Sequence, residues 1–476
     1  MEPLRVTLIN AGRITLTMPA VSPPLGLLYL AAYARKHLPV TFQVIDQRVF
    51  DLPLSAVMRQ MRDFSPQVIG IRCLTANAGM ARQLAEAARA EFPDAVLVAG
   101  GPHASAMGSR LLEDMPLNAT IPGEGEIPFT RLLQAVASYS DFSAIPGIWW
   151  KNSVGEVIHN PGIPEHIEDI DSIPMPAYEL IDVQVYSRRR NMTMLPRRPH
   201  YFSLFTSRGC PYRCIYCHSI FGKRFRPHSP ERVVEEIEWL AGHYGIQDFD
   251  ILDDIFNMNA DRVFRIVDLI QRKDIKARFA FPNAMRTDIL TEEVMDALVE
   301  MGTYMSAFAL ETGSPRLQRV IGKNLNIEKY LAGVRMAARR RIFTYGFAML
   351  GFPGETAEEM QMTVDTICNS ELHAVLFFTV TPFPGTPLFE QVFREHPEKL
   401  QQLDYEGKDY MFKLTANLSQ VSDEELTQKL REANLRFYLN PHRIIRIVRD
   451  YPDLRQLVSP TVRFFLMLSI PKLKRA

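Results

Sequence analysis

Over the first stretch of about 140 residues, short apolar runs alternate with longer amphipathic ones. The short runs are rich in valine and isoleucine and end at turn residues, which is typical of buried strands. They predict strands at 5–10, 41–46, 68–72, 95–100 and 119–121. The longer stretches predict helices at 25–36, 54–63, 79–91, 105–114 and 126–139. Five such units favour a doubly wound, Rossmann-like parallel sheet, which binds ligands at the carboxyl ends of its strands.

The same alternation resumes after residue 200. The predicted strands are at 201–206, 248–253, 278–282, 304–310, 343–350 and 374–380. The main predicted helices are at 230–243, 261–272, 291–301 and 357–369. Six strand–helix units make a partial (β/α)6 barrel, and the active sites of parallel barrels gather at the carboxyl ends of the strands.

The segments outside these two patterns differ in character. Prolines recur between the two units, where 148–151 and 156–158 predict a small hairpin. The last ~80 residues are predicted to be helical. The chain therefore divides into an α/β domain at 1–144, a linker at 145–195, a barrel core at 196–395 and a helical C-terminal region at 396–476.

Composition adds the expected environment. Of 476 residues, 47% are hydrophobic and 23% charged, as in soluble globular proteins. Lys+Arg and Asp+Glu both total 54, so net charge gives no drive toward nucleic acid. No apolar run reaches the ~18 residues that span a bilayer, and the N-terminus lacks a signal-peptide pattern. Of five cysteines, Cys73 and Cys368 fit buried packing positions, so we expect a cytoplasmic protein without disulfides.

The other three cysteines lie close together, as Cys210, Cys214 and Cys217 in the sequence T-S-R-G-C-P-Y-R-C-I-Y-C-H-S. Three thiolates on one loop can hold three irons of a 4Fe–4S cluster and leave the fourth iron open to a small molecule. Tyr216 supplies an aromatic wall. The alternative is a zinc site with His218 as fourth ligand, although that residue directly follows the last cysteine, whereas zinc motifs space their ligands in separated pairs.

The spacing C-x3-C-x-aromatic-C resembles the signature of radical S-adenosylmethionine (SAM) enzymes. In that family the open iron binds SAM, which is then split to give a radical. The resemblance implies a 4Fe–4S cluster on the three cysteines, SAM as cosubstrate, and a flavodoxin or ferredoxin-type electron donor.

Four motifs at the ends of barrel strands are similar to SAM-binding stretches of the same family: D-D-I-F after the second strand, N-A-M-R after the third, A-L-E-T-G-S after the fourth and L-G-F-P-G-E-T after the fifth. The resemblance implies that SAM is contacted by Asp253, Asp254, Arg286, Glu311, Thr312, Gly351, Pro353 and Gly354. For Arg286, whose guanidinium could pair with a carboxylate as a fork, a plain surface ion pair is an open alternative.

Glycine-rich loops follow the strands of the N-terminal sheet. Glycine lets a ligand approach the backbone closely, although each loop taken alone fits a tight turn equally well. No G-x-G-x-x-G follows the first strand, which disfavours a dinucleotide. Together, P-P-L-G, G-G-P-H and G-E-G-E resemble the cobalamin-binding domain that precedes many radical SAM cores. The resemblance implies a cobalamin site at Pro24, Gly26, Arg72, Thr75, Gly100, Gly101, His103, Gly123, Glu124, Gly125 and Glu126.

One departure concerns the cobalt ligand. Cobalamin domains of the mutase type carry D-x-H-x-x-G with a cobalt-ligating histidine, whereas the stretch after the second strand here reads D-Q-R-V-F, with Gln47 and Arg48 where the histidine would fall. The resemblance thus implies cobalamin without a histidine on its lower face, with residues 72–77 beside that face. His103 fits a loop hydrogen bond better than a cobalt ligand.

The resemblance also implies a reaction. Most similar members are methyltransferases that move a methyl group from SAM, by way of cobalamin, to an unactivated carbon of a small-molecule or natural-product substrate. Two alternatives stay open: an oxidative cyclase or ring-rearranging enzyme without methyl transfer, and a non-catalytic iron–sulfur or cobalamin sensor. A sensor would not need the SAM-binding motifs at the strand ends.

Basic clusters remain at 188–190 and 197–198, where a solvated surface and a contact to an anionic group are both open. The C-terminal stretch 463–475 is apolar and then basic. It fits a packed terminal helix or peripheral membrane contact.

Overall fold

The N-terminal sheet has seven strands in the computed structural model, which describes residues 2–14, 20–193, 195, 200–401, 403–405, 414 and 416–451. In spatial order they are β2 (Val40–Asp46), β1 (Leu4–Asn10), β3 (Val68–Arg72), β4 (Val96–Gly100), β5 (Ala119–Ile121), β6 (Trp149–Lys151) and β7 (Val157–His159). The first five are parallel, as predicted. Leu8 and its neighbour Ile9 pack into clusters on opposite faces, which explains why these strands are apolar throughout.

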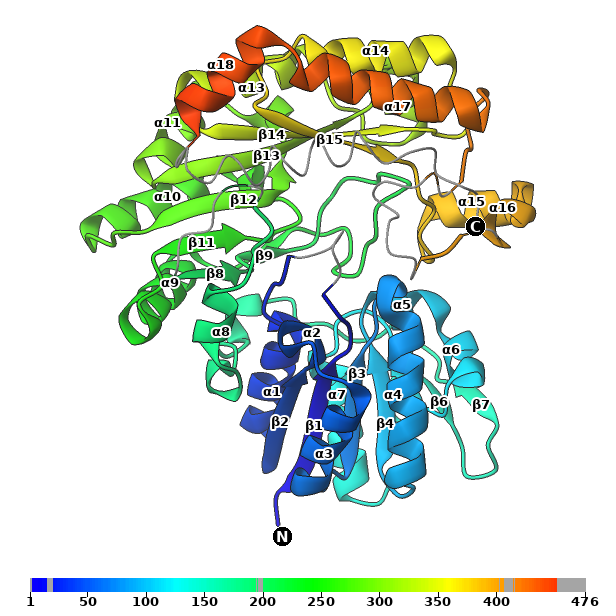
Figure 1. Ribbon diagram of the computed structural model, residues 1–476. Helices are drawn as coiled ribbons and strands as arrows, with labels where there is room; N and C mark the ends of the chain where they lie inside the picture. Colours follow the sequence, from blue (N-terminus) through cyan, green and yellow to red (C-terminus); the bar gives the residue numbers. More distant parts are fainter. Residues whose placement is uncertain are drawn as a thin grey trace.

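Helices cover both faces of this sheet (Figure 1). The helices α1 (Leu25–His37) and α7 (Glu126–Ala137) pack on one face, and α3 (Leu54–Phe64) and α4 (Ala78–Glu91) pack on the other. Short helices α2 (Gln47–Phe50), η1 (Thr75–Asn77), α5 (Pro102–Met107) and α6 (Ser109–Asp114) fill the connections. The doubly wound fold is confirmed.

The predicted hairpin is present but belongs to the sheet. Its first strand, β6, pairs antiparallel with β5, so the sheet continues past residue 144 into what we expected to be linker. Trp150 supports the junction by donating from Nε1 to Asn160 Oδ1 over 2.8 Å. Pairing with the hairpin covers the edge of the three-residue strand β5, whose backbone groups would otherwise face solvent.

The second unit is a partial barrel of six parallel strands in sequential order. These are β8 (Tyr201–Leu204), β11 (Asp248–Ile251), β12 (Arg278–Met285), β13 (Thr303–Glu311), β14 (Phe343–Leu350) and β15 (Ala374–Thr379). Its outer helices are α9 (Pro230–Tyr244), α10 (Ala260–Arg272), α11 (Glu292–Glu300), α12 (Pro315–Val320), α13 (Ile327–Arg339) and α14 (Ala357–Cys368). The predicted barrel is confirmed.

The two units face each other with the carboxyl ends of the N-terminal strands directed at the barrel (Figure 1). Tyr29 of α1 and Phe202 of β8 belong to one hydrophobic cluster that spans both units. The linker, with η2 (Ile170–Ser172), η3 (Tyr178–Leu180) and α8 (Val183–Ser187), reinforces this contact. The Tyr186 hydroxyl of α8 donates to the buried Asp46 carboxylate at the end of β2 over 2.6 Å. The arrangement places the ligand-binding edge of the first sheet opposite the second unit.

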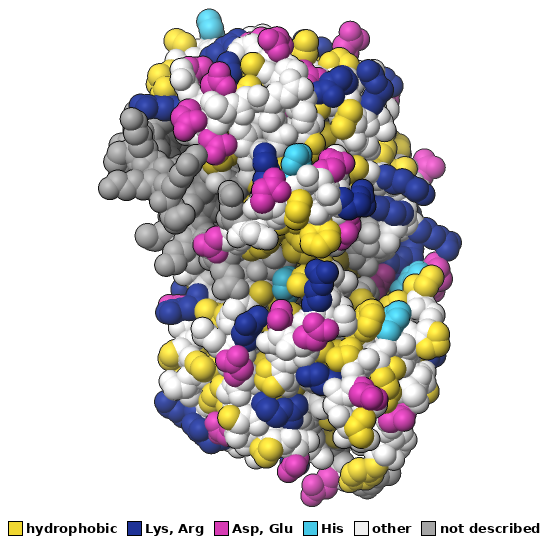
Figure 2. All heavy atoms as spheres, turned by 90° about the vertical axis from the view of Figure 1, so that its right-hand side faces the viewer, with side chains coloured by type: hydrophobic (Ala, Val, Ile, Leu, Met, Phe, Trp, Pro, Cys, Tyr) yellow, Lys and Arg dark blue, Asp and Glu magenta, His cyan; other side chains and the backbone are white. Residues whose placement is uncertain are grey.

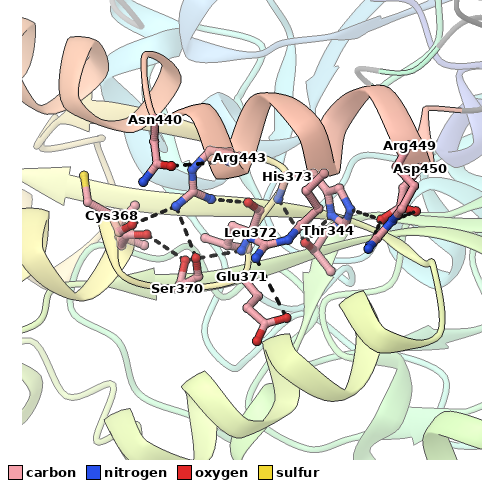
Figure 3. Close-up of polar contacts among 12 residues, drawn as sticks. Thr344, Cys368, Ser370, Glu371, Leu372, His373, Asn440, Arg443, Arg449 and Asp450 are labelled. Atoms are coloured by element: carbon pink, nitrogen blue, oxygen red, sulfur yellow. Dashed lines mark hydrogen bonds and ion pairs between the residues drawn. The ribbon is translucent and has the colours of Figure 1, made fainter.

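The C-terminal helices α15 (Pro387–Glu395), α16 (Pro397–Gln401), α17 (Asp423–Tyr438) and α18 (Pro441–Asp450) follow the last strand. Figure 3 shows how α18 is fastened to the barrel. Arg443 donates to the carbonyls of Cys368, Ser370 and Leu372. His373 accepts from the backbone N–H of Thr344 at Nδ1 over 3.0 Å and donates from Nε2 to Asp450 over 3.0 Å. Burial lowers the pKa of His373 to about 4, so this fastening uses a neutral imidazole.

Two of the surface expectations can be compared with the structure. On the face shown in Figure 2, positive and negative side chains are interspersed, in keeping with the balanced net charge. Within the described residues, no helix combines the length and apolar character needed to cross a bilayer. The basic cluster 197–198 and the apolar–basic stretch 463–475 lie outside the described residues.

Candidate cofactor site between the two units

The three clustered cysteines lie on one loop with a short stem. The strands β9 (Ser207–Arg208) and β10 (Arg226–Pro227) pair antiparallel and enclose residues 209–225, which we name the cysteine loop. Gly209 opens it at φ +81°, where a Cβ would lie 2.2 Å from the carbonyl oxygen of Arg224, so the tight entry requires glycine. Ile215, in the middle of the loop, donates to Ile321 O and accepts from Leu388 N. The middle of the loop is therefore held by backbone hydrogen bonds to the end of α12 and the start of α15.

A cavity of about 230 Å³ lies beside this loop. Its lining residues are Cys210, Cys217, His218, Gly222, Lys223, Asp254 and Asn283. Within the described part of the chain, no three His, Cys, Asp or Glu side chains converge closely enough to hold a single metal ion. Cys210 and Cys217 line the cavity, whereas Cys214, between them in the chain, does not. A 4Fe–4S cluster takes its thiolates on separate irons, so its cysteines need not converge on one point, whereas structural zinc needs four donors at one point. The cysteine loop fits the cluster.

The paired aspartates after β11 have different surroundings. The Asp253 carboxylate accepts from the backbone N–H of Thr206, from its hydroxyl, and from the hydroxyl of Ser207, each over 2.6 Å. Asp253 is 2% exposed, so it orients the chain just before the cysteine loop instead of facing the cavity. Asp254 lines the cavity, and burial raises the pKa of its carboxyl. Of the two predicted SAM contacts, Asp254 is the one in position to touch a ligand.

Backbone strain marks the ends of the third and fourth barrel strands. Glu311 has φ +67° and Ala284 has φ +80°, values that non-glycine residues seldom adopt. The pairing of β13 with β14 shifts register just before Glu311. The Glu311 carboxylate is buried and accepts from Lys323 Nζ over 3.1 Å. Such strain gathers at functional sites, which supports the predicted role of Glu311 in this region.

Two other predicted SAM contacts are already engaged within the protein. The Thr312 hydroxyl is fully buried, accepts from Ser314 N over 3.2 Å, and lies 3.3 Å from the hydroxyl of Thr363. Arg286 forms a fork to Asp288 over 2.7 and 3.0 Å. Its guanidinium also stacks 3.5 Å from the ring of Tyr212 in the cysteine loop. Arg286 is thus engaged in an ion pair, although with 11% of each side chain exposed it is not the surface pair that was the alternative, and it contacts the cysteine loop through Tyr212.

The glycine turn after β14 is organised by one carboxylate. Glu355 accepts from the backbone N–H groups of Gly351 and Phe352 over 2.6 and 3.0 Å. Burial raises its pKa to about 7. Both glycines of the turn have positive φ, +98° at Gly351 and +66° at Gly354, with Pro353 between them. The Phe352 ring lies 6.0 Å from the Tyr216 ring, so this turn packs against the cysteine loop.

On the facing edge of the N-terminal sheet, several predicted positions border open space. Around Gly26 and around Gly123, which has φ +70°, an added Cβ would meet no atom within 4 Å, and at Gly100 it would meet only one carbonyl, at 3.9 Å. At Gly101, with φ +96°, it would lie 3.1 Å from Cys73 O. Pro24 precedes α1 beside Gly26. An edge with little side-chain cover fits a large, flat ligand such as a corrin ring.

The residues expected near the lower face of cobalamin are hydrogen-bonded to one another or to neighbouring strands. Arg72 donates from Nη1 to Asn10 Oδ1 over 2.9 Å, and burial lowers its pKa. His103 Nδ1 lies 3.2 Å from the Thr75 hydroxyl, in agreement with the loop hydrogen bond predicted for it. Gln47 accepts from Gly12 N and donates to Leu52 O, so its amide is engaged at both ends. The position of the mutase-type histidine is thus taken by Gln47, whose amide is already hydrogen-bonded within the protein.

The acidic residues of G-E-G-E do not border open space. Glu124 and Glu126 are buried and pair with Arg208 and Arg226 of the cysteine-loop stem. A Cβ at Gly125, between them, would lie 2.9 Å from the Leu30 side chain, so this glycine serves close packing. The loop thus connects the two units, a role that the sequence did not reveal because the partner arginines are more than 80 positions away.

Besides Gly222, three residues of the cavity were not predicted as ligand contacts: His218, Lys223 and Asn283. His218 was considered only as a zinc ligand, and Asn283 belongs to the motif from which Arg286 was chosen. Lys223 lies six residues beyond Cys217, and its only sequence signal is a cation inside the cysteine loop. Each adds a polar or charged group next to the thiols.

Comparison with known proteins agrees with this geometry. The chain matches a model of the radical SAM superfamily over residues 204–367 and a model of the B12-binding domain over residues 14–133. It is 30% identical over 433 residues to an uncharacterized methyltransferase of Pyrococcus horikoshii, covering 90% of each chain. It is 27% identical over 425 residues to the cytidylyl-2-hydroxyethylphosphonate methyltransferase of Streptomyces wedmorensis, covering 79% of each.

Among solved structures, the cobalamin-dependent SAM radical enzyme OxsB, with aqua-cobalamin and SAM bound, aligns with a TM-score of 0.74 at 17% identity. The alignment covers 100% of this chain and 77% of that one. The two proteins share the order and arrangement of the two units.

Proposed function

Since the chain belongs to the radical SAM superfamily, among those members in which a B12-binding domain precedes the radical SAM domain, we propose that it is a methyltransferase acting on an unactivated carbon of a small molecule. Family membership makes it an enzyme whose cofactors are a 4Fe–4S cluster, SAM and cobalamin. When bound, these supply a substrate radical and a methyl group to combine with it. The rest of the proposal concerns what the protein's own residues do.

The cysteine loop provides the cluster ligands Cys210, Cys214 and Cys217, and the adjoining cavity is the place for SAM. Asp254 and Asn283 offer acceptors there, and Lys223 offers a cation. Their chemistry matches the amino and carboxylate groups of SAM, which carry charges of opposite sign. Tyr216 of the cysteine loop packs against Phe352 of the turn at 351–354, with the two rings 6.0 Å apart.

The observation that carries the proposal is the meeting of two ligand sites at one interface. The cavity beside the cysteines belongs to the unit at which the carboxyl ends of the N-terminal strands are directed, and the sparsely covered positions Gly26 and Gly123 lie at that end of the N-terminal sheet (Figure 1). The backbones also approach closely, because a Cβ at Gly385 of the barrel would lie 2.8 Å from Ala106 Cβ in α5. A methyl group could pass between such neighbouring sites without entering bulk water.

The test uses SAM labelled in its methyl group and needs no knowledge of the substrate. Protein reconstituted with cluster and cobalamin is reduced anaerobically and incubated with the labelled SAM. We expect label in the cobalamin fraction and release of 5′-deoxyadenosine. Deoxyadenosine with no label on cobalamin would overturn methyl transfer in favour of an oxidative cyclase, and the absence of both would favour a sensor. Protein with Cys214→Ala is the matched control for cluster-dependent products.

We also propose a flavodoxin or ferredoxin-type protein as electron donor in a cytoplasmic setting. A one-electron reduction of the cluster must precede SAM cleavage, and the exposed Cys217 is the cluster ligand nearest to solvent. Cluster reduction is measured by electron paramagnetic resonance with reduced flavodoxin in place of dithionite. If only dithionite produces the reduced signal, this choice of donor is wrong.

A further inference from the structure

Four charged side chains meet in the interior between the two units. Arg208 donates to Glu124 and to Glu126, each over 2.6 Å, and Arg226 donates to Glu124. All four side chains are only 4–6% exposed. We name this group the ion-pair bridge. Two cations and two anions balance, so burial is tolerated because every charge has a partner.

The bridge holds both ends of the cysteine loop. Arg208 and Arg226 are direct partners across the two-stranded stem. Arg226 also donates to Ile167 O in the linker and to Phe221 O inside the loop. The Arg208 guanidinium lies 5.3 Å from the ring of Tyr29 in α1 and 5.4 Å from that of Phe221. The stem is thus fixed to the first unit by oriented hydrogen bonds, not by apolar contact alone.

The bridge also connects the two proposed cofactor sites along the chain. Glu124 and Glu126 follow Gly123, which borders the open edge of the N-terminal sheet. On the other side, Arg208 stands two positions before Cys210, the first cluster ligand. A displacement of either loop would pull charged groups apart in a region that water does not screen. Guanidinium forks tolerate little change in angle, so the two loops must move together.

We propose that the ion-pair bridge couples the two sites, so that cobalamin bound against the loop at 123–126 increases the affinity of the cluster site for SAM. By linkage, SAM then increases the affinity for cobalamin by the same factor. Glu124 and Glu126 are positioning residues in this scheme. The inference rests on the cofactors and not on the methyl-transfer reaction, so a binding experiment tests it even if the proposed reaction is wrong.

The experiment measures the dissociation constant of SAM by anaerobic calorimetry on cluster-reconstituted protein, with and without saturating hydroxocobalamin. For the unmodified protein we expect cobalamin to lower this constant by about fivefold or more, the smaller end of common coupling factors. Glu124→Gln removes the negative charge shared by both arginines and leaves a single acceptor oxygen. In this variant the ratio of the SAM dissociation constants without and with cobalamin should fall close to one. Iron and cobalt content, measured beside it, shows that each cofactor still binds.

Glu168→Gln is the matched control. Glu168 also pairs with an arginine of the cysteine loop, Arg224, over 2.7 Å, but both side chains are largely exposed. The Glu168→Gln variant should keep the ratio of the unmodified protein, because an exposed ion pair contributes little interaction energy. If Glu124→Gln fails to fold, Glu126→Gln decides by the same ratio, since it removes one negative charge of the bridge and leaves Arg208 paired with Glu124.

Two results would overturn the proposal. One is an unmodified protein whose affinity for SAM does not respond to cobalamin. The other is a bridge variant that retains the full ratio, which would make the bridge a purely structural contact.

Discussion

The same substitution at the two adjacent aspartates after β11, Asp253 and Asp254, should have different effects. Asp253 accepts three hydrogen bonds from Thr206 and Ser207, at the entrance to the cysteine loop. Asp254 lines the cavity, where burial already raises its pKa and so disfavours the carboxylate. Replacing each with asparagine removes a charge and keeps the shape, so the difference between the two variants isolates what each charge does.

The magnitude for Asp253→Asn follows from its contacts. A hydrogen bond to a charged group contributes about 1.5–3 kcal/mol net, and a neutral one about 0.5–1.5 kcal/mol. The loss is then about 1 kcal/mol for each of three bonds, or about 3 kcal/mol for local opening of the segment at Thr206. Arg262, which donates to Thr206 O over 2.6 Å, adds to this loss because Asp253 is a nearby buried anion. A change of about 3 kcal/mol corresponds to roughly a hundredfold in an opening equilibrium.

Hydrogen exchange of the Thr206 amide measures this opening directly, because that N–H donates to Asp253. We expect roughly hundredfold faster exchange in Asp253→Asn, together with a lower iron content after reconstitution. In Asp254→Asn we expect exchange at Thr206 to stay within a few-fold of the unmodified protein, with normal iron content and weaker SAM binding. Equal acceleration by both substitutions would refute the separate roles.

Three further outcomes are expected. Alanine at any of the three cluster cysteines should abolish the 4Fe–4S absorbance. Cys73→Ala should retain it, because Cys73 is a fully buried packing residue. A full cluster in a variant that lacks Cys214 would contradict the ligand assignment. Glu355 has its pKa raised from 4.5 to about 7, so the folded form binds more protons and stability falls as pH rises from about 4.5 to 7. The denaturant midpoint of Glu355→Gln should therefore change less between pH 4.5 and 7 than that of the unmodified protein. His373 has its pKa lowered from 6.5 to about 4, so stability present above pH 6.5 is lost as pH falls toward 4. The protection factors of amides in α18, which are exchange rates corrected for their intrinsic pH dependence, should therefore be smaller at pH 5 than at pH 7, and equal protection factors would speak against a neutral His373.

Local patterns predicted the architecture well because both units are built from parallel strands with helices between them. The strands at 68–72, 119–121 and 343–350 were predicted with the bounds that the structure has. A buried parallel strand must be apolar on both faces, and a turn must follow it. An apolar run bounded by turn residues is therefore enough to locate the strand in the sequence. The hairpin at 149–159 was found in the same way, but not the sheet to which it adds.

The site was predictable only in part. Cys210, Cys214 and Cys217 could be assigned because a cluster needs thiolates at a fixed short spacing, which is a property of the sequence. The sequence could not show which of Asp253 and Asp254 faces the ligand, because both follow the same strand. Only the hydrogen bonds of Thr206 to Asp253 separate their roles.

What the sequence by itself determined about this protein is its two α/β units and their order, and it supplied the three cysteines proposed as cluster ligands, because each follows from residues that are close together in the chain. The tertiary structure alone decided that Glu124 and Glu126 face Arg208 and Arg226 instead of open space, and that Arg286 is committed to Asp288. The physical reason is that a charged side chain pairs with whichever opposite charge folding brings within about 4 Å, at a strength set by how far water is excluded. Sequence separation carries no information about either quantity.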